Sequence, residues 1–352
     1  MAINLMDKWA KKLADAFAKD SVTAGKASTD YEFDGTQSIK ILSISTQAPG
    51  NYSRSGTSRY GTPTDVQDTY QVLTMTQDKS FSLVVDKGDN SEQMMLKNAG
   101  KVMRRQQLEQ IVPMIDKHNL RKWAEGAGKV VATTAAPDKT TIVALLLAAE
   151  THFEDSKVPV NERYVGMSNA TYALIRTASE FVGCDNLTDK LLLKGYKGDF
   201  STMKVVTVAA TEMPTNVNFI AWQKSCVLAP HKIHEAKIHQ DPPGISGHLL
   251  EGRDIFDAFV IGTRCNGVYA SVAKDKKAAT PTATKGDTTT ALASSGNVII
   301  YTLDGSDPRY SPTAVTYSSA IANPEAGTVI KAYAHKLAND IYGSDVLTHV
   351  CV

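Results

Sequence analysis

The sequence predicts an α+β fold organised around one unusually long helix, followed by a small all-β domain at the C-terminal end. Three observations support this prediction. Residues 91–126 keep a helical periodicity for far longer than an ordinary helix. Residues 140–240 alternate between helix-like and strand-like segments, and after Lys274 the chain consists of short β-rich pieces separated by turns. A length of 352 residues leaves room for about two or three domains.

The long helix is predicted over residues 91–126. Ser91 is a typical capping residue, and apolar residues then recur every three or four positions, so that one face is buried. Two glycines follow its last turn, as they often do at a helix end. Pro113 removes one backbone donor and predicts a kink near Glu109. At 1.5 Å per residue such a helix would span about 50 Å, so we expect it to act as a strut for the remaining segments.

The N-terminal residues predict an arm. Residues 4–20 form a short amphipathic pattern with Trp9 and Phe17 on its apolar face and lysines elsewhere. We interpret this segment as a helix docked on the body, although a basic amphipathic helix can also meet a membrane or a partner. Residues 21–36 are polar and irregular.

A two-stranded ribbon is predicted next. Residues 38–46 and 69–76 alternate like strands, and 79–85 continue the strand pattern. Between the first two lies a stretch of about twenty residues, 48–68, rich in glycine, serine and threonine, and a polar loop of this length is commonly functional or disordered. A lone ribbon is barely stable in water, so we expect it to lie on another surface, such as a neighbouring copy of the chain.

After the long helix, the pattern is that of a mixed α/β domain over about residues 140–240. The expected helices are residues 140–156 and 169–178, and the expected strands are 165–168, 204–209 and 218–222. Residues 248–256 and 258–269 are interpreted as a closing hairpin or strand pair. Residues 274–286 are charged and then rich in alanine, threonine and proline, which is typical of a linker. The short strands expected beyond it, at 297–303, 314–317 and 328–335, predict a sandwich-like module.

Composition and motifs argue against several classes of function. With 38 basic and 37 acidic residues, the chain has no strong bulk attraction to nucleic acid or anionic membranes. The four cysteines lack metal-site spacing, which suits a reducing cytoplasm, and we find neither a signal peptide nor a membrane-spanning run. His231, His234, His239 and His248 cluster in the sequence without the spacing of a metal site. No motif assembles a nucleophile and a base, so we expect no enzyme, no metal and no cofactor.

Several stretches together resemble the major capsid proteins of tailed bacteriophages, which have the Hong Kong 97-type shell fold. The stretches that carry the resemblance are residues 52–68 (YSRSGTSRYGTPTDVQD) and 75–82, residues 85–90 with the long helix through Pro113 and Asp116, residues 158–168 with 172–175, and residues 247–269. The likeness covers about residues 1–273 and rests on four blocks in the right order, since no single block would suffice.

The resemblance implies a division of the chain and a function. The implied parts are an N-terminal arm (1–36), an extended-loop hairpin (37–78), a peripheral domain (79–139 and 241–273) that holds the spine helix 91–126, an axial domain (140–240), a linker (274–286) and a C-terminal immunoglobulin-like domain (287–352). Identical subunits would form the hexamers and pentamers of an icosahedral shell around double-stranded DNA, in a virion assembled in the bacterial cytoplasm without a membrane. Portal and scaffolding proteins would be further partners.

The same resemblance indicates where subunits should meet. We expect Tyr52, Arg54, Arg59 and Tyr60 at the loop tip to contact a neighbouring subunit, and Trp9 and Phe17 to anchor the arm. Some members of the family join subunits through a lysine of the extended loop, but no lysine lies between Ile41 and Asp78, so we expect a non-covalent shell. Only about 36 residues precede the first predicted strand, so we expect a separate scaffolding protein or none.

The C-terminal module resembles another family, the immunoglobulin-like domain at the C-terminus of chitobiase and β-hexosaminidases. Residues 301–308 (YTLDGSDP) look like its signature and 330–334 (IKAYA) like a later strand, although ordinary turn chemistry also explains the Asp-Gly and Asp-Pro pairs. The resemblance implies weak glycan binding, as for such modules on phage surfaces, and the candidate residues are Tyr301, Tyr310 and Tyr317. We expect the module to decorate or brace the outside of the shell.

Two other functions remain open from the sequence. The first is an encapsulin-type nanocompartment, which would have the same shell fold but no DNA. The second is a carbohydrate-binding adhesin that acts through the C-terminal module.

Overall fold

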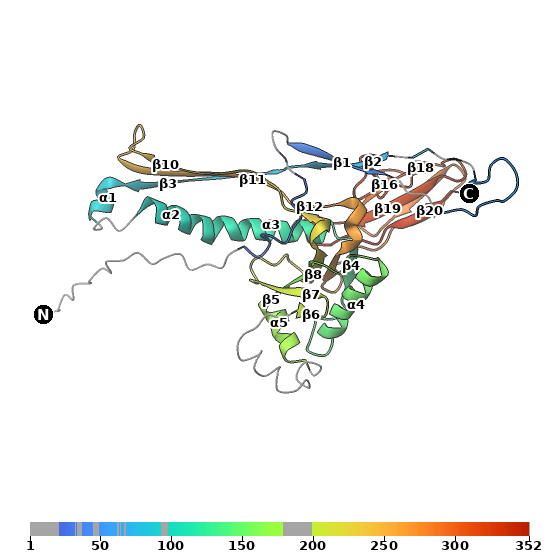
Figure 1. The fold of residues 1–352 in the computed structure, drawn as a ribbon, viewed down its shortest axis with the longest axis horizontal. Coiled ribbons are helices and arrows are strands. Elements are labelled where there is room, and N and C mark those ends of the chain that lie inside the picture. The colour runs from blue at the N-terminus through green and yellow to red at the C-terminus, as the bar shows by residue number, and fades with distance from the viewer. Residues whose placement is uncertain are drawn as a thin grey trace.

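The computed structural model describes residues 21–351 except 32, 34–36, 45–48, 62, 64, 67, 93–97 and 179–198. It has three parts (Figure 1): an elongated part in which a helix runs beside a β-ribbon, a body built on a mixed sheet, and a pair of C-terminal sheets at the opposite end from the elongated part. The predicted α+β fold is confirmed at this level.

The long helix is continuous over 27 residues, though it is not uniform. It consists of α2 (Ala99–Gln106), a π-helical turn (Gln107–Ile111) and α3 (Val112–Glu125), about 40 Å in all. The N-cap is Asn98, whose side chain accepts a hydrogen bond from the backbone N–H of Lys101 at 3.3 Å. The cap predicted at Ser91 is wrong, because Ser91 lies inside a separate short helix, α1 (Lys87–Glu92).

Near Glu109, where Pro113 predicts a kink, the helix contains a π-helical turn. The backbone N–H of Val112 bonds to the carbonyl of Gln107, five residues earlier, instead of four. Pro113 follows directly, at the start of α3, where its missing N–H is tolerated.

A three-stranded antiparallel ribbon runs alongside this helix (Figure 1). Its strands are β10 (His231–Gln240), β11 (Gly247–Phe256) and β3 (Gln77–Asp86), with β11 in the centre. Val85 and Leu250 pack against Met103 of α2, and Phe256 packs against Ile111 and Ile115. Burial of these side chains therefore fastens the ribbon to the helix along its length.

The hairpin predicted over 248–256 and 258–269 is wrong. Strand β11 pairs with β10 and β3, whereas β13 (Val268–Val272) belongs to the sheet of the body. Between them the chain turns away, because the short β12 (Phe259–Val260) pairs with β9 (Val227–Leu228) and a 3₁₀ segment follows at Gly262–Gly267.

A second ribbon has the two strands that the sequence predicts, β1 (Ser38–Ile44) and β2 (Asp68–Thr74). One face rests on the chain's own body rather than on another copy. Ile41 and Leu73, both buried, pack with Leu228 and Ile261 there, and Phe33 and Met75 belong to the same cluster. The third predicted segment does not continue this ribbon, because β3 pairs with β11 instead.

The body is a six-stranded mixed sheet in the order β4-β13-β8-β5-β7-β6. Its remaining strands are β4 (Lys129–Ala132), β5 (Arg163–Ser168), β6 (Asp199–Phe200), β7 (Met203–Val208) and β8 (Val217–Gln223), and its helices are α4 (Ile142–Asp155) and α5 (Asn169–Arg176). One face of the sheet packs Trp222 against Trp123 of α3, and the other packs Phe219 and Met167 with Phe153 of α4. Helices and strands are mixed here as predicted, but the sheet also includes β4 and β13 from outside residues 140–240, and β10 belongs to the three-stranded ribbon.

The C-terminal part consists of two sheets around a small core. The sheets are β14-β15-β18, with β14 (Thr282–Lys285), β15 (Thr289–Ala293) and β18 (Ile321–Ala322), and β17-β16-β19-β20, with β17 (Val315–Thr316), β16 (Val298–Thr302), β19 (Val329–His335) and β20 (Leu347–Val350). Leu292, Ile299 and Ala332 form the core together with Ala278. The predicted linker is therefore wrong over much of its length, because Ala278 is buried and β14 is part of a sheet.

Candidate functional site

The loop that joins β1 to β2 has an ordered pair of aromatic side chains at its tip. Within its described residues 49–61, the rings of Tyr52 and Tyr60 meet edge to face with their centroids 5.0 Å apart. The backbone N–H of Ser53 bonds to the carbonyl of Arg59 at 2.9 Å, and the Arg59 Nε donates to the carbonyl of Gly56 at 3.2 Å. Tyr60 is nevertheless 92% exposed. The structure thus brings together three of the four predicted tip residues, and Arg54 lies in the same exposed turn.

The second candidate surface is the outer ribbon face, which we define as Leu42, Ile44, Tyr70 and Val72. Leu42 lies opposite Tyr70 in the register, so the two side chains share one face of the ribbon. Leu42 and Ile44 are each 63% exposed. The Lys40 ammonium lies 5.1 Å from the centre of the Tyr70 ring at the edge of this face. Contiguous exposed apolar side chains of this kind mark interaction surfaces. The strand alternation in the sequence was the available signal for this face, which sequence reasoning missed.

Trp9 and Phe17, the predicted anchors of the arm, lie outside the described residues. The structure shows instead where the described part of the arm, from Ser21 onward, is held. Asp116 of α3, which is 2% exposed, accepts hydrogen bonds from the backbone N–H groups of Val22 (2.7 Å) and Thr23 (3.2 Å). It also accepts from the hydroxyls of Ser21 (2.7 Å) and Thr23 (2.5 Å). We call these four residues the arm anchor.

Two further contacts extend the arm anchor. The Asn119 side chain donates to the Thr23 hydroxyl at 3.0 Å, one turn further along α3. The indole N–H of Trp222 donates to the carbonyl of Lys26 at 2.9 Å. Residues 21–26 of the arm are therefore fixed on both the long helix and the body sheet.

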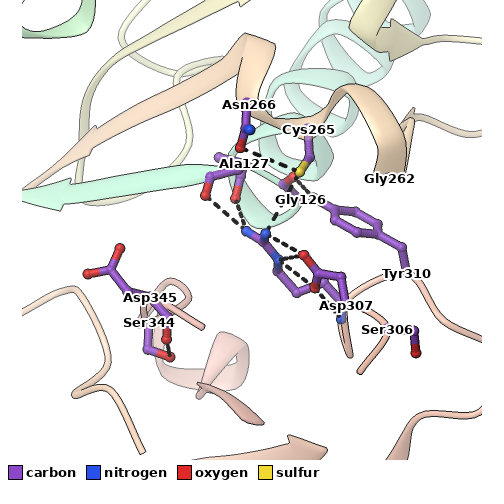
Figure 2. A network of polar contacts seen from close by, with 12 residues as sticks. Gly126, Ala127, Gly262, Cys265, Asn266, Ser306, Asp307, Tyr310, Ser344 and Asp345 are labelled. Atoms are coloured by element: carbon purple, nitrogen blue, oxygen red, sulfur yellow. Dashed lines mark hydrogen bonds and ion pairs between the residues drawn. The ribbon is translucent and has the colours of Figure 1, made fainter. Parts of the chain in front are cut away.

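The C-terminal sheets dock on the end of α3 through the turn that contains the YTLDGSDP motif (Figure 2). The Tyr310 hydroxyl donates to the carbonyl of Gly126 at 2.6 Å. The Arg309 Nη1 donates to the carbonyls of Ala127 (3.1 Å) and Gly128 (3.0 Å). Asp307 holds the same guanidinium through its two carboxylate oxygens, at 3.0 Å to Nε and 2.7 Å to Nη2. We call this set of contacts the helix-end contact.

The electrostatics of the helix-end contact favour a charged arginine and neutral tyrosines. Burial would lower the pKa of Arg309, but the carboxylate of Asp307 raises it above its ordinary value. Burial raises the pKa of Tyr310 well above its usual range, and it raises the pKa of Tyr333, which lies beside the guanidinium, to about 12. Arg309 therefore stays charged, and Tyr310 and Tyr333 stay neutral, at any ordinary pH.

The three predicted glycan-contact tyrosines do not form one platform. The Tyr310 hydroxyl is bonded to the end of α3. Tyr301 and Tyr317 meet edge to face at 6.2 Å and pack against the core between the C-terminal sheets, where the Tyr317 oxygen accepts from the backbone N–H of Leu292. Glycan binding by these residues stays a prediction.

Three of the four clustered histidines are engaged in structural contacts, whereas the buried Nδ1 of His248 has no hydrogen-bond partner among the described residues. His234 pairs with the buried Asp254 at 2.5 Å, His239 pairs with Glu251 at 3.2 Å, and the ring of His231 stacks on Phe256. Among the described residues, no group of three or more histidine, cysteine, aspartate or glutamate side chains is arranged to hold a metal ion.

Two of the described cysteine thiols, those of Cys226 and Cys265, are poor candidates for nucleophiles. Burial raises the pKa of Cys226 to about 11 and also raises the pKa of Cys265.

In the part of the chain that the structure describes, no helix has the length and apolar character needed to cross a bilayer.

A long helix beside a β-ribbon, joined to a mixed-sheet body, is the fold of bacteriophage capsid structures. A solved structure from Mycobacterium phage Che8 matches with a TM-score of 0.64 at 17% identity, covering 77% of this chain and 98% of that one. The capsid structure of cyanophage P-SCSP1u matches with a TM-score of 0.60 at 12% identity, covering 77% and 93%. The mature capsid of bacteriophage PhiM1 matches with a TM-score of 0.57 at 12% identity, covering 77% and 92%.

Sequence comparison adds information on the C-terminal sheets. Residues 290–350 match a domain family described as "Fn3 associated". No curated protein matches the chain.

Proposed function

We propose that this chain is the major capsid protein of a tailed bacteriophage. Copies would form hexamers and pentamers that close into an icosahedral shell around double-stranded DNA, in a virion assembled in the host cytoplasm. The observation that carries the proposal is the fold, since three quarters of the chain superpose on nearly the full length of phage capsid structures. The proposed role is structural rather than enzymatic.

The proposal assigns a role to each part of the fold in the Hong Kong 97 scheme. Residues 1–36 would be the arm, 37–78 the extended loop, 79–139 with 241–273 the peripheral domain, and 140–240 the axial domain. Residues 287–352 would be an immunoglobulin-like domain on the outside of the shell. Portal and scaffolding proteins would be additional partners.

Two open surfaces support assembly with identical neighbours. The tip with Tyr52 and Tyr60 and the outer ribbon face both expose large apolar side chains, which a monomer gains nothing by keeping in water. The two surfaces lie on the same ribbon, whose opposite face is already occupied by the chain's own body. A neighbouring subunit that covers the outer face would therefore complete the burial of the ribbon. Such a contact joins different patches on the two subunits, as closed rings require.

The test of the proposal is a double substitution of Arg54 and Arg59 to alanine. The expected product is a folded subunit that fails to form shells, because both arginines lie in the exposed tip and contribute little to the subunit itself. Lys139 and Lys274 are exposed on the body, and their double substitution to alanine removes the same charge as a matched control. Electron microscopy and sedimentation measure the yield of particles.

Normal shells from the Arg54/Arg59 variant would show that the tip is not an assembly contact. The absorbance of purified wild-type particles at 260 nm relative to 280 nm tests the cargo. Protein-only particles would favour a nanocompartment over a virion.

A further inference from the structure

The C-terminal domain is held to the rest of the chain by several non-covalent contacts in addition to its peptide connection. Besides the helix-end contact, the Tyr342 ring lies in the core of the body, and its hydroxyl donates to the carbonyl of Thr215 at 2.9 Å. Asp345 pairs with Lys129 at the start of β4 (2.8 Å) and with Lys277 (2.5 Å). The domain is thus held at several separate points on the body.

The helix-end contact supplies donors to the chain as it leaves α3. Helix α3 ends at Glu125, and Tyr310 donates to the carbonyl of its C-cap residue, Gly126. The Arg309 guanidinium, which is 10% exposed, donates to the next two carbonyls, those of Ala127 and Gly128, between the helix and β4. Loss of these donors would leave carbonyl groups without partners in a largely buried place.

A short strap, which we define as Val260, Ile261 and Gly262, lies between the C-terminal domain and the β1–β2 ribbon. Tyr310 packs directly over Gly262, where a Cβ atom would lie 2.7 Å from the Cβ of the tyrosine. Only glycine therefore fits beneath this ring. Ile261 points the other way and is buried with the inner face of the ribbon.

The same strap holds the ribbon by its backbone. The Gln71 side chain of β2 accepts from the N–H of Gly262 at 2.8 Å and donates to the carbonyl of Val260 at 3.0 Å. One side-chain amide thus forms hydrogen bonds with two backbone groups of the strap. An unbroken series of contacts runs from Arg309 and Tyr310 through Gly262 to Gln71.

We propose that the C-terminal domain is a built-in clamp that fixes the base of the β1–β2 ribbon relative to the end of the long helix. The ribbon base follows residue 37 and the clamp comes from residues beyond 300, so the clamp closes only after the C-terminal domain has folded and docked. The domain then helps to hold the ribbon and the long helix in place, and does not only cover the surface of the subunit. This inference concerns the single subunit and does not depend on the formation of shells.

Hydrogen exchange of the unassembled full-length subunit, followed by mass spectrometry, tests the clamp. The variant is Arg309→Met, which keeps an apolar stem and removes the guanidinium donors. We expect amide exchange to become roughly tenfold faster in residues 121–128, 260–267 and 69–74, since local opening there no longer has to break the helix-end contact. Exchange in 298–302 and 329–335, inside the C-terminal sheets, should stay unchanged.

The matched control is Ile299→Val, which removes one buried methylene from the core of the same domain and leaves the clamp intact. It should accelerate exchange in 298–302 and 329–335 more than in 69–74. The clamp is refuted if Arg309→Met changes exchange only around residues 305–311, or if both variants give the same pattern. Should Arg309→Met fail to fold, Tyr310→Phe, which removes only the hydroxyl bond to Gly126, is measured on the same peptides and decides by the same criterion.

Discussion

Removal of the Asp116 carboxylate should detach the part of the N-terminal arm around Ser21, Val22 and Thr23 from α3. In Asp116→Ala, the N–H groups of Val22 and Thr23 and the Thr23 hydroxyl lose a charged acceptor in a buried place. Hydrogen bonds to a charged group contribute about 1.5–3 kcal/mol each and do not add fully. We therefore expect the free energy of unfolding to fall by about 3–5 kcal/mol, a loss that detachment of the segment itself would limit.

Asp116→Asn should have a smaller effect, about 1–3 kcal/mol, because the amide keeps one acceptor oxygen and turns an N–H group towards the same donors. The assay is urea unfolding of the unassembled subunit followed by tryptophan fluorescence, since Trp222 donates to Lys26 within the segment concerned. The matched control is Lys117→Ala, at the next and exposed position of α3, which should change stability by less than about 0.5 kcal/mol. If Asp116→Ala unfolds like the Lys117 control, the arm anchor contributes nothing to stability and the argument fails.

Three further predictions concern other parts of the fold. Gly262→Ala should lower the free energy of unfolding by about 1–3 kcal/mol through its clash with Tyr310, whereas Gly50→Ala, where a Cβ meets no atom within 4 Å, should not; urea unfolding compares them. Replacing Leu42 and Ile44 by serine should leave subunit stability nearly unchanged and reduce the yield of shells, and equal particle counts by electron microscopy would contradict this. Burial lowers the pKa of His152 below 6.5, so the unfolded chain binds more protons and stability should decrease as the pH falls through about 6.5; His152→Phe should flatten that part of the curve, and an unchanged curve would remove the assignment.

Local pattern was enough to predict the elements whose contacts are local. The alternation of exposed and buried side chains in β1 and β2 is visible in the sequence, and the predicted strand boundaries differ from the observed ones by only one or two residues. The long helix was predicted for the same reason. Its start was misplaced because both Ser91 and Asn98 are capping residues, and the sequence does not distinguish a short separate helix from the first turns of a long one.

The errors concern strand partners. Strand β11 was assigned a partner that follows it in the sequence, yet it pairs with β10, just before it in the chain, and with β3, about 170 residues earlier. Buried Asp257, at the end of β11, holds the turn that prevents the hairpin, because its carboxylate accepts from Thr76 and contacts His118. Each of these residues reads as an ordinary polar residue in its own segment, and only the tertiary structure brings them together.

The candidate site shows the same division. The exposed tip could be predicted from its composition, because glycine, serine and tyrosine in a long polar loop indicate a surface contact. The role of Arg309 could not, since turn chemistry already accounts for the Asp-Pro motif before it and its carbonyl partners lie about 180 residues away. The one available signal for the arm anchor was a lone acid, Asp116, beside Ile115 on an apolar stripe.

The π-helical turn at Gln107–Ile111 determines which side chains of the long helix face the three-stranded ribbon. Such a turn is equivalent to one extra residue in an α-helix, and each residue rotates the helix by about 100°. Met103 before the turn and Ile115 after it both face the three-stranded ribbon only because of that rotation. Deleting the exposed Gln110 should therefore give a regular α-helix in which Met103 and Ile115 still face the ribbon, because the deletion removes the extra residue that the turn accommodates. A deletion within the regular helix α3 would instead rotate its two parts against each other by about 100° and present the wrong side chains to the ribbon.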